Sequence, residues 1–338
     1  MTTAVAAPVT SVDVGVPWHY GDPLREQRWL VAGSALVDLS HRGVVTVSGP
    51  DRLSWLHDLT TADVRTLRPN ESRIALVLDP QGRVLHELHL VDDGSTTWLC
   101  VEQATTPDLV KYLTQMKFML AVEVVDQTKD VAIVGQFGSV RIPGAIIAWS
   151  APPEWTATGV TSSGMDRGGD ATKYVPSRPG GFDAVEYFVP RDKLPEFLAA
   201  GQHLAGTWAW EALRAGAAVP RLGVDTDARS LPHELGWIGP AVHLAKGCYR
   251  GQESVARTHN MGKPPRRLVL LHLDGTADVD VVSGDPVTAD NVVVGRVGTV
   301  AVHYEMGPIA LAVVKRRIDP ATPLQAGSVA ATQEVVVV

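Results

Sequence analysis

The chain has 338 residues, of which 45% are hydrophobic and 20% charged, the composition of an ordinary globular protein with length for two or three domains. The formal net charge of −7 argues against a protein that binds nucleic acid over a broad basic face. A local basic patch could still form from Arg250, Arg257, Lys263, Arg266 and Arg267. Two cysteines exclude a disulfide framework and a cysteine-only metal site, and the interrupted apolar stretches exclude a membrane-spanning helix.

Residues 1–16 are small and apolar and carry no Lys or Arg, so they lack the features of a signal peptide. They predict a cytoplasmic protein with a disordered N-terminus. A β-branched strand over 44–48 then ends at Gly49-Pro50, and a helix follows from Asp51. Strands over 74–78 and 84–90 flank Asp79-Pro80-Gln81-Gly82, which predicts a hairpin.

A strand over 97–101 contains Cys100, and a helix begins near Pro107. Strands over 122–125 and 131–134 complete a pattern that indicates an α+β sandwich, not a doubly wound parallel sheet. We expect Met116, Phe118 and Met119 to lie in the core.

From 142 to 181 the chain is rich in Gly, Pro, Ser and Thr, which indicates an extended connection between domains. Helices are predicted over 194–205 and 208–218. After Pro264-Pro265, short strands separated by Gly, Asp or Pro predict a small antiparallel β-barrel.

The run Lys246-Gly247-Cys248-Tyr249-Arg250-Gly251-Gln252-Glu253 contains one of the two cysteines. Lys246 and Arg250 flank the sulfur, and Arg257 and His259 follow. Cations and a helix that begins near Gly251 would both favour the thiolate of Cys248. The alternative is that Cys248 is a buried structural thiol, which composition alone favours. Cys100, in an apolar run without nearby cations, is assigned to the core.

A second charged stretch runs from Leu213 to Glu234 and includes a helix that ends before Pro220. Asp225, Asp227 and Arg229 could bind a polar ligand, although a solvated loop also explains them. The sequence has no glycine-rich phosphate loop, no helical His-x-x-x-His pair and no nucleophile elbow at Ser139.

The run 246–253, continued by Val255-Ala256-Arg257, together with Pro220–Asp227 and Leu231-Pro232-His233-Glu234, resembles the YgfZ branch of the folate-dependent glycine-cleavage T-protein (aminomethyltransferase) superfamily. Val47–Leu53 and Asp79–Val84 are similar to the superfamily's N-terminal pattern. The likeness extends from about Leu36 into the C-terminal barrel.

The resemblance implies an α+β fold, a three-domain cloverleaf of the T-protein type with two α/β sandwich domains and a C-terminal antiparallel β-barrel. After a disordered segment 1–16, the first domain is discontinuous over 17–50 and 142–262 and carries the cysteine motif. A ferredoxin-like second domain covers 51–141, and the barrel covers 263–338.

The resemblance further implies a folate-binding accessory protein for assembly or repair of iron–sulfur enzymes, with links to tRNA modification. Cys248 is the expected reactive thiol, and the implied folate contacts are Arg214, Asp225 and Lys246. The implied cofactor is tetrahydrofolate or a one-carbon derivative, with no resident metal or cluster. The expected partners are client iron–sulfur proteins or their assembly factors, without nucleic acid or membrane. The rest of the expected signature consists of Gly247, Tyr249, Gly251, Gln252, Glu253 and Arg257.

Two departures from the transferases stand out. Gly216 occupies the place of the carboxylate that hydrogen-bonds the pterin, and Glu102-Gln103 follow Cys100 where the transferases carry a catalytic Asp. The alternative function, a folate-dependent aminomethyl- or methyltransferase or demethylase on an unknown substrate, therefore stays open beside the accessory role.

Overall fold

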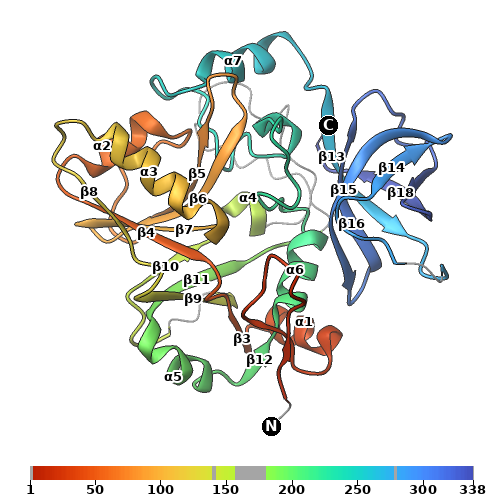
Figure 1. Cartoon of the computed structure of the whole chain (residues 1–338), viewed down its shortest axis with the longest axis horizontal. Helices are drawn as coiled ribbons and strands as arrows, with labels where there is room; N and C mark the ends of the chain where they lie inside the picture. Colours follow the sequence, from red (N-terminus) through yellow and green to blue (C-terminus); the bar gives the residue numbers. More distant parts are fainter. Residues whose placement is uncertain (1–2, 139–141, 157–179, 278–279, 338) are drawn as a thin grey trace.

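The computed structural model describes residues 3–138, 142–156, 180–277 and 280–337. Figure 1 shows two sheet-and-helix bodies and a barrel gathered around the middle of the molecule, with the barrel on the right. The mixed α/β sheets and the closed six-strand antiparallel barrel confirm the predicted fold class. None of the helices within the described ranges is long and apolar enough to cross a membrane.

The first body is built on a five-stranded sheet whose strands come from both sides of the second body in the sequence. Its strand order is β10 (Ile147–Ser150), β11 (Ala184–Pro190), β9 (Val131–Phe137), β3 (Ala35–Asp38) and β12 (His203–Ala205). Strand β9 is buried along its whole length because both faces of the sheet are covered. The helices of this body are α1 (Pro23–Val31), α4 (Pro153–Thr156), α5 (Leu194–Ala199) and α6 (Thr207–Gly216).

The second body is a five-stranded antiparallel sheet with two helices on one face. Its strand order is β5 (Ser72–Leu78), β6 (Val84–Asp92), β7 (Thr96–Val101), β4 (Gly43–Ser48) and β8 (Glu123–Asp126). Alternate residues divide the faces: Val45 packs in the core under helices α2 (Arg52–Leu59) and α3 (Thr106–Met116), whereas Val44 packs in the core shared with the first body.

The C-terminal barrel has the strand order β13 (Arg266–Leu273), β16 (Gly307–Lys315), β15 (Val292–His303), β14 (Pro286–Ala289), β17 (Leu324–Ala326) and β18 (Val329–Val335). Its interior is filled by small and β-branched side chains such as Val269, Val287 and Ala310. Leu268 and Leu270 on the other face of β13 join the large core. The barrel therefore packs on the first body and is not a separate appendage.

Strand pairing shifts the predicted domain boundaries. Strand β4, expected in the segment 17–50, pairs with β7 and β8 of the second body. Strand β9, expected in the segment 51–141, pairs with β3 and β11 of the first body. The expected connection over 142–181 contains β10 and α4, and its residues 157–179 lie outside the described part of the chain.

Three further expectations differ from the structure. The N-terminal segment expected to be disordered contains β1 (Val5–Ala6), which pairs with β2 (Pro17–His19). The helix expected over 194–205 ends at Ala199, and its last residues form β12. The predicted core residues Met116, Phe118 and Met119 are 44%, 84% and 85% exposed, because α3 ends at Met116 and the chain turns away from the sheet.

Candidate functional site

The cysteine motif forms a loop that ends where α7 (Gln252–Met261) begins. Gly251 adopts φ +83°, and a Cβ there would lie 2.5 Å from the carbonyl oxygen of Asp79. Only glycine satisfies both constraints. The start of α7 therefore sits directly on the predicted hairpin turn, where Ser254 Oγ donates a hydrogen bond of 3.4 Å to the carbonyl of Pro80.

Lys246 anchors the other end of the motif in the second body. Its ammonium donates hydrogen bonds to the carbonyl oxygens of His57, Thr60 and Ala62, at the C-terminal end of α2. A cation there satisfies carbonyls that have no partner within the helix and complements its dipole. Burial lowers the pKa of Lys246 to about 8. Lys246 thus has a structural partner in place of the predicted position beside the thiol.

Cys248 lies between these two anchors and is exposed, whereas Cys100 on β7 is buried as expected. The guanidinium of Arg250 lies 5.9 Å from the ring of Tyr112 on α3, and Arg257 is exposed on α7. Burial raises the pKa of the Cys100 thiol well above its ordinary value. The two thiols therefore differ in access, with Cys248 at the surface.

The remaining signature residues shape the loop. Tyr249 is buried, with its ring centroid 5.1 Å from Lys246 Nζ. The side chain of Gln252 donates a hydrogen bond of 3.2 Å to the carbonyl of Lys246, which closes the loop from within. Gly247 and Glu253 are exposed.

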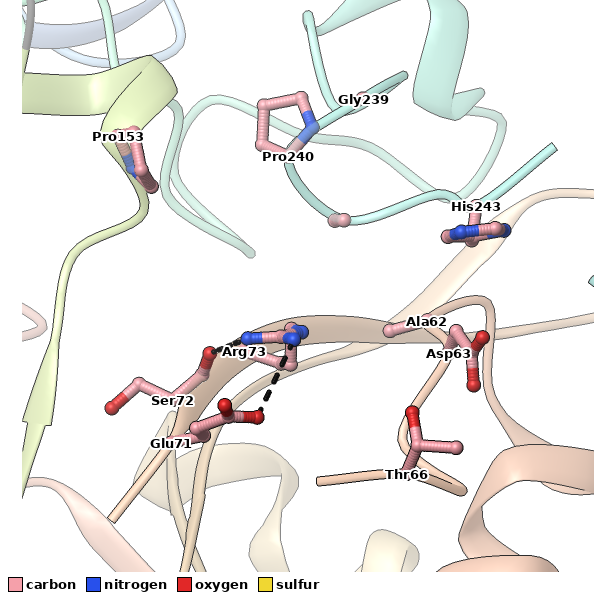
Figure 2. A pocket seen from close by; sticks show the side chains of 11 residues that line it. Ala62, Asp63, Thr66, Glu71, Ser72, Arg73, Pro153, Gly239, Pro240 and His243 are labelled. Atoms are coloured by element: carbon pink, nitrogen blue, oxygen red, sulfur yellow. Dashed lines mark hydrogen bonds and ion pairs between the residues drawn. The ribbon is translucent and has the colours of Figure 1, made fainter. Parts of the chain in front are cut away.

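A cavity of about 560 Å³ opens between β5 and the loop that leads into the motif (Figure 2). The cavity has both polar and apolar walls, with the charged side chains of Asp63, Glu71 and Arg73 on one side and the imidazole of His243 near Asp63. Arg73 already pairs with Glu71 at 3.7 Å, and Asp63 pairs with His57 at 3.0 Å. These pairs hold the cavity wall together.

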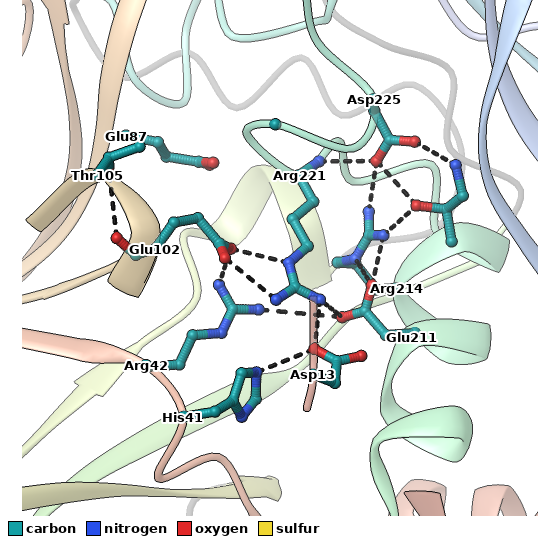
Figure 3. Close-up of polar contacts among 12 residues, drawn as sticks. Asp13, His41, Arg42, Glu87, Glu102, Thr105, Glu211, Arg214, Arg221 and Asp225 are labelled. Atoms are coloured by element: carbon teal, nitrogen blue, oxygen red, sulfur yellow. Dashed lines mark hydrogen bonds and ion pairs between the residues drawn. The ribbon is translucent and has the colours of Figure 1, made fainter. Parts of the chain in front are cut away.

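A buried ionic network occupies the middle of the molecule (Figure 3). Its hub is the guanidinium of Arg221, whose nitrogens lie 2.7 Å from Asp13 Oδ1, 2.8 Å from Glu102 Oε1 and 3.3 Å from Glu211 Oε1. Arg42 also donates to Glu102. Burial opposes ionisation of Glu102, but Arg221 and Arg42 outweigh it and lower the pKa of Glu102 to about 2.

The predicted folate contacts Arg214 and Asp225 belong to the same interior. Arg214 pairs with Glu211 at 2.6 Å and with Asp225 at 2.9 Å, and it donates to Thr299 Oγ1 of the barrel. Asp225 accepts a hydrogen bond of 2.7 Å from the backbone N–H of Thr299. Together with Lys246, these residues join parts of the protein in this structure, and their role as folate contacts stays a prediction.

Gly216 has a structural reason to lack a side chain. A Cβ at this position would lie 2.7 Å from the ring of His303 on β15. A side chain here would require the ring of His303 to shift. The position that the family resemblance aligns with a pterin-binding carboxylate therefore lies against the barrel in this chain.

The sequence analysis missed the ligands of the Arg221 hub. Asp13 lies in the segment expected to be disordered, and Glu102 was noted only as a departure from the transferases. The sequence did contain one sign of a buried ion pair, which is a charged residue inside an apolar stretch. Glu211 lies within α6, where the other positions are mostly apolar. Such a residue needs a partner when it is buried.

His89 and Glu186 form a second buried pair, which joins the two sheets. His89 Nδ1 lies 2.9 Å from Glu186 Oε2, and the imidazole stacks on Trp149 with centroids 4.0 Å apart. Burial disfavours the imidazolium, but Glu186 outweighs burial and raises the pKa of His89 to about 9. Across the described ranges, no group of three or more His, Cys, Asp and Glu side chains could hold a metal ion.

The network predicts a stability loss in acid. Glu102 has a pKa of about 2 when folded and 4.5 in its ordinary state, so its contribution is present above pH 4.5 and disappears as the pH falls towards 2. The shift corresponds to about 3 kcal/mol. We expect Glu102→Gln to destabilise the protein at pH 7, and the gap to wild type to narrow by about that amount towards pH 2.

Urea unfolding at a series of pH values measures this gap. Asp58→Asn, which removes an exposed carboxylate 3.0 Å from Arg65, is the matched control and should stay within about 0.5 kcal/mol of wild type throughout. A gap for Glu102→Gln that is constant with pH would contradict the assignment.

Comparison with known proteins agrees with this architecture. Residues 3–139 match the family model described as the GCVT N-terminal domain. The aminomethyltransferase T of the glycine cleavage system from Bartonella henselae has the same fold, with a TM-score of 0.73, 17% sequence identity and coverage of 99% of this chain and 93% of that one.

Two curated relatives carry different names. An aminomethyltransferase of Bordetella petrii is 29% identical over 247 residues, which cover 69% of this chain and 66% of the relative. The mitochondrial iron-sulfur cluster assembly factor IBA57 homolog of Mycosarcoma maydis is 29% identical over 259 residues, which cover 71% of this chain and 58% of the relative. The chain thus spans less than two thirds of the length of either relative. The chain is related to the glycine-cleavage T-protein (aminomethyltransferase) superfamily and, through the assembly factor, to its YgfZ-like branch.

Proposed function

We propose that this chain is an accessory protein for the assembly or repair of iron–sulfur enzymes and that Cys248 is its reactive thiol. The observation that carries the proposal is the exposure of Cys248 in a loop anchored at both ends. Lys246 binds the carbonyls at the end of α2, and Gly251 sits on the β5–β6 turn. An anchored loop holds a functional side chain in place at low entropic cost.

The chemistry of a single thiol defines how it could act on a cluster. Protein-held iron–sulfur clusters usually need about four ligands, so Cys248 alone cannot hold one. We propose transient ligation, in which the client supplies the other ligands and Cys248 contributes one thiolate sulfur. An exposed thiol can reach a cluster on another protein, whereas the buried Cys100 cannot.

Tetrahydrofolate binding is the second part of the proposal. Arg214, Asp225 and Lys246 already have partners within the protein, so we add Glu87, which is ion-paired with His89, as a candidate folate contact. Glu87 Oε1 is buried without a hydrogen-bond partner among the described residues, and its side chain points towards the middle of the molecule (Figure 3). His89 Nε2 is 3.8 Å away from it. A carboxylate oxygen in this position can accept hydrogen bonds from the N–H groups of a pterin. The bound tetrahydrofolate would carry a one-carbon unit.

The alternative, a folate-dependent transferase or demethylase, draws support from the aminomethyltransferase relatives. It is the weaker candidate because Gly216 has no room for a carboxylate. The links to tRNA modification and to the cytoplasm stay predictions from the sequence.

Replacing the thiol tests the first part of the proposal. In cells that lack the native gene, we expect the Cys248→Ser protein to be folded and abundant. The activity of client iron–sulfur enzymes in these cells should nevertheless be as low as in cells that carry no copy of the gene. Cys100→Ala is the matched control, because its thiol is buried and should affect stability only. Full enzyme activity with Cys248→Ser would contradict a role for this thiol.

Calorimetric titration with tetrahydrofolate tests the second part. We expect wild type and Cys248→Ala to bind one equivalent alike, and Glu87→Gln to bind at least about tenfold more weakly because a charged acceptor is lost. Glu196→Gln, on the exposed face of α5, should bind as wild type does. If wild type does not bind tetrahydrofolate, the proposal of folate binding is wrong, whereas the proposal for the Cys248 thiol is unaffected.

A further inference from the structure

The N-terminal residues 3–16, here called the strap, bury one charged side chain, Asp13, together with the apolar side chains of Ala7 and Val16. Asp13 is 3% exposed, and its Oδ1 lies 2.7 Å from Arg221 Nη1 and 2.9 Å from His41 Nε2. Burial opposes ionisation of Asp13, but Arg221 and His41 outweigh it and keep its pKa well below the ordinary value. The strap therefore inserts a charged group into the ionic network in the middle of the molecule.

The rest of the strap is weakly attached. Val9, Val12 and Val14 are 89%, 55% and 51% exposed. Among the described residues, the backbone hydrogen bonds of this stretch close within the strap, as from Ala7 N–H to the carbonyl of Val16, or onto β2. Segments with little burial and local hydrogen bonds open at low free-energy cost. Asp13 is thus the ionic contact of the strap with the interior, beside the apolar contacts of Ala7 and Val16.

Withdrawal of Asp13 would leave hydrogen-bond donors without acceptors but no isolated charge. Arg221 would keep Glu102 and Glu211 as ionic partners, so the cation would stay compensated. Arg221 Nη1 and His41 Nε2 would each lose their acceptor on Asp13. Two neighbouring buried nitrogens, His41 Nδ1 and Arg42 Nε, already have no hydrogen-bond partner in the described part of the chain. Unsatisfied buried donors favour binding of another acceptor.

We propose that Arg221 and His41 form a carboxylate-binding site that Asp13 fills from within and that a small acidic molecule fills when the strap is displaced. The ligand class is a carboxylate, either free as a dicarboxylate or as the glutamyl tail of a folate. The inference depends neither on Cys248 nor on a pterin, so it goes beyond the proposed function.

Titration with glutarate measures the competition between strap and ligand. When a binding site is open for only a fraction of the time, its apparent affinity for a ligand is reduced by that fraction. Removing the charge of Asp13 should favour the open state and so raise the apparent affinity for glutarate. We expect Asp13→Asn to bind glutarate at least about tenfold more tightly than wild type. Asp192→Asn, an exposed carboxylate on the surface, should match wild type. Equal affinity of Asp13→Asn and wild type, or no binding to either, overturns the proposal.

Hydrogen exchange on the wild-type protein tests the same site without a substitution. Saturating glutarate should speed amide exchange in residues 5–16 and leave β9 unchanged; unchanged exchange in the strap overturns the proposal, even if Asp13→Asn does not fold. Tetrahydrofolate and its analogue without the glutamyl tail identify the source of the carboxylate. If glutarate opens the strap and tetrahydrofolate does not, the ligand of the site is a free dicarboxylate. That result supports the proposed site whether or not folate binds elsewhere on the protein.

Discussion

The guanidinium of Arg221 is the interaction on which the arrangement of the whole molecule depends. It joins Asp13 of the N-terminal strap, Glu102 at the end of the second sheet and Glu211 on α6 of the first body. Through Glu211 and Arg214 the same network reaches Thr299 in the barrel. Loss of Arg221 itself would deprive Asp13, Glu102 and Glu211 of the cation that they share, so this side chain matters more than any one of its partners.

The thiol that we propose to act on iron–sulfur clusters lies at the surface and outside the Arg221 network. Arg214 and Asp225, which family resemblance marks for folate, instead join the first body to the barrel. Lys246 likewise fastens the cysteine loop to α2. The exposed thiol of Cys248 is accessible to a partner protein. The motif then combines structural residues with one reactive group, and residues of a single motif need not share a role.

Local patterns in the sequence predicted local structure well. The hairpin turn at Asp79–Gly82, the terminal barrel and the buried Cys100 all follow from spacing and turn residues, and the structure confirms them. The site was harder to predict because its contacts are long-range: Asp13 and Arg221 are 208 residues apart. Proximity in sequence also misled, since Lys246 lies two positions from Cys248 but points into the second body. The exposed Phe118 shows that an apolar residue beyond a helix end need not reach the core.

The central claim is that the Arg221 hub couples the N-terminal strap, the second sheet and α6 of the first body. A double-mutant cycle with Arg221→Met and Glu102→Gln, measured by urea unfolding at pH 7, tests it most directly. The account predicts a coupling free energy of about 2 kcal/mol or more between these two side chains. Additive effects, with coupling below about 0.3 kcal/mol, would contradict it.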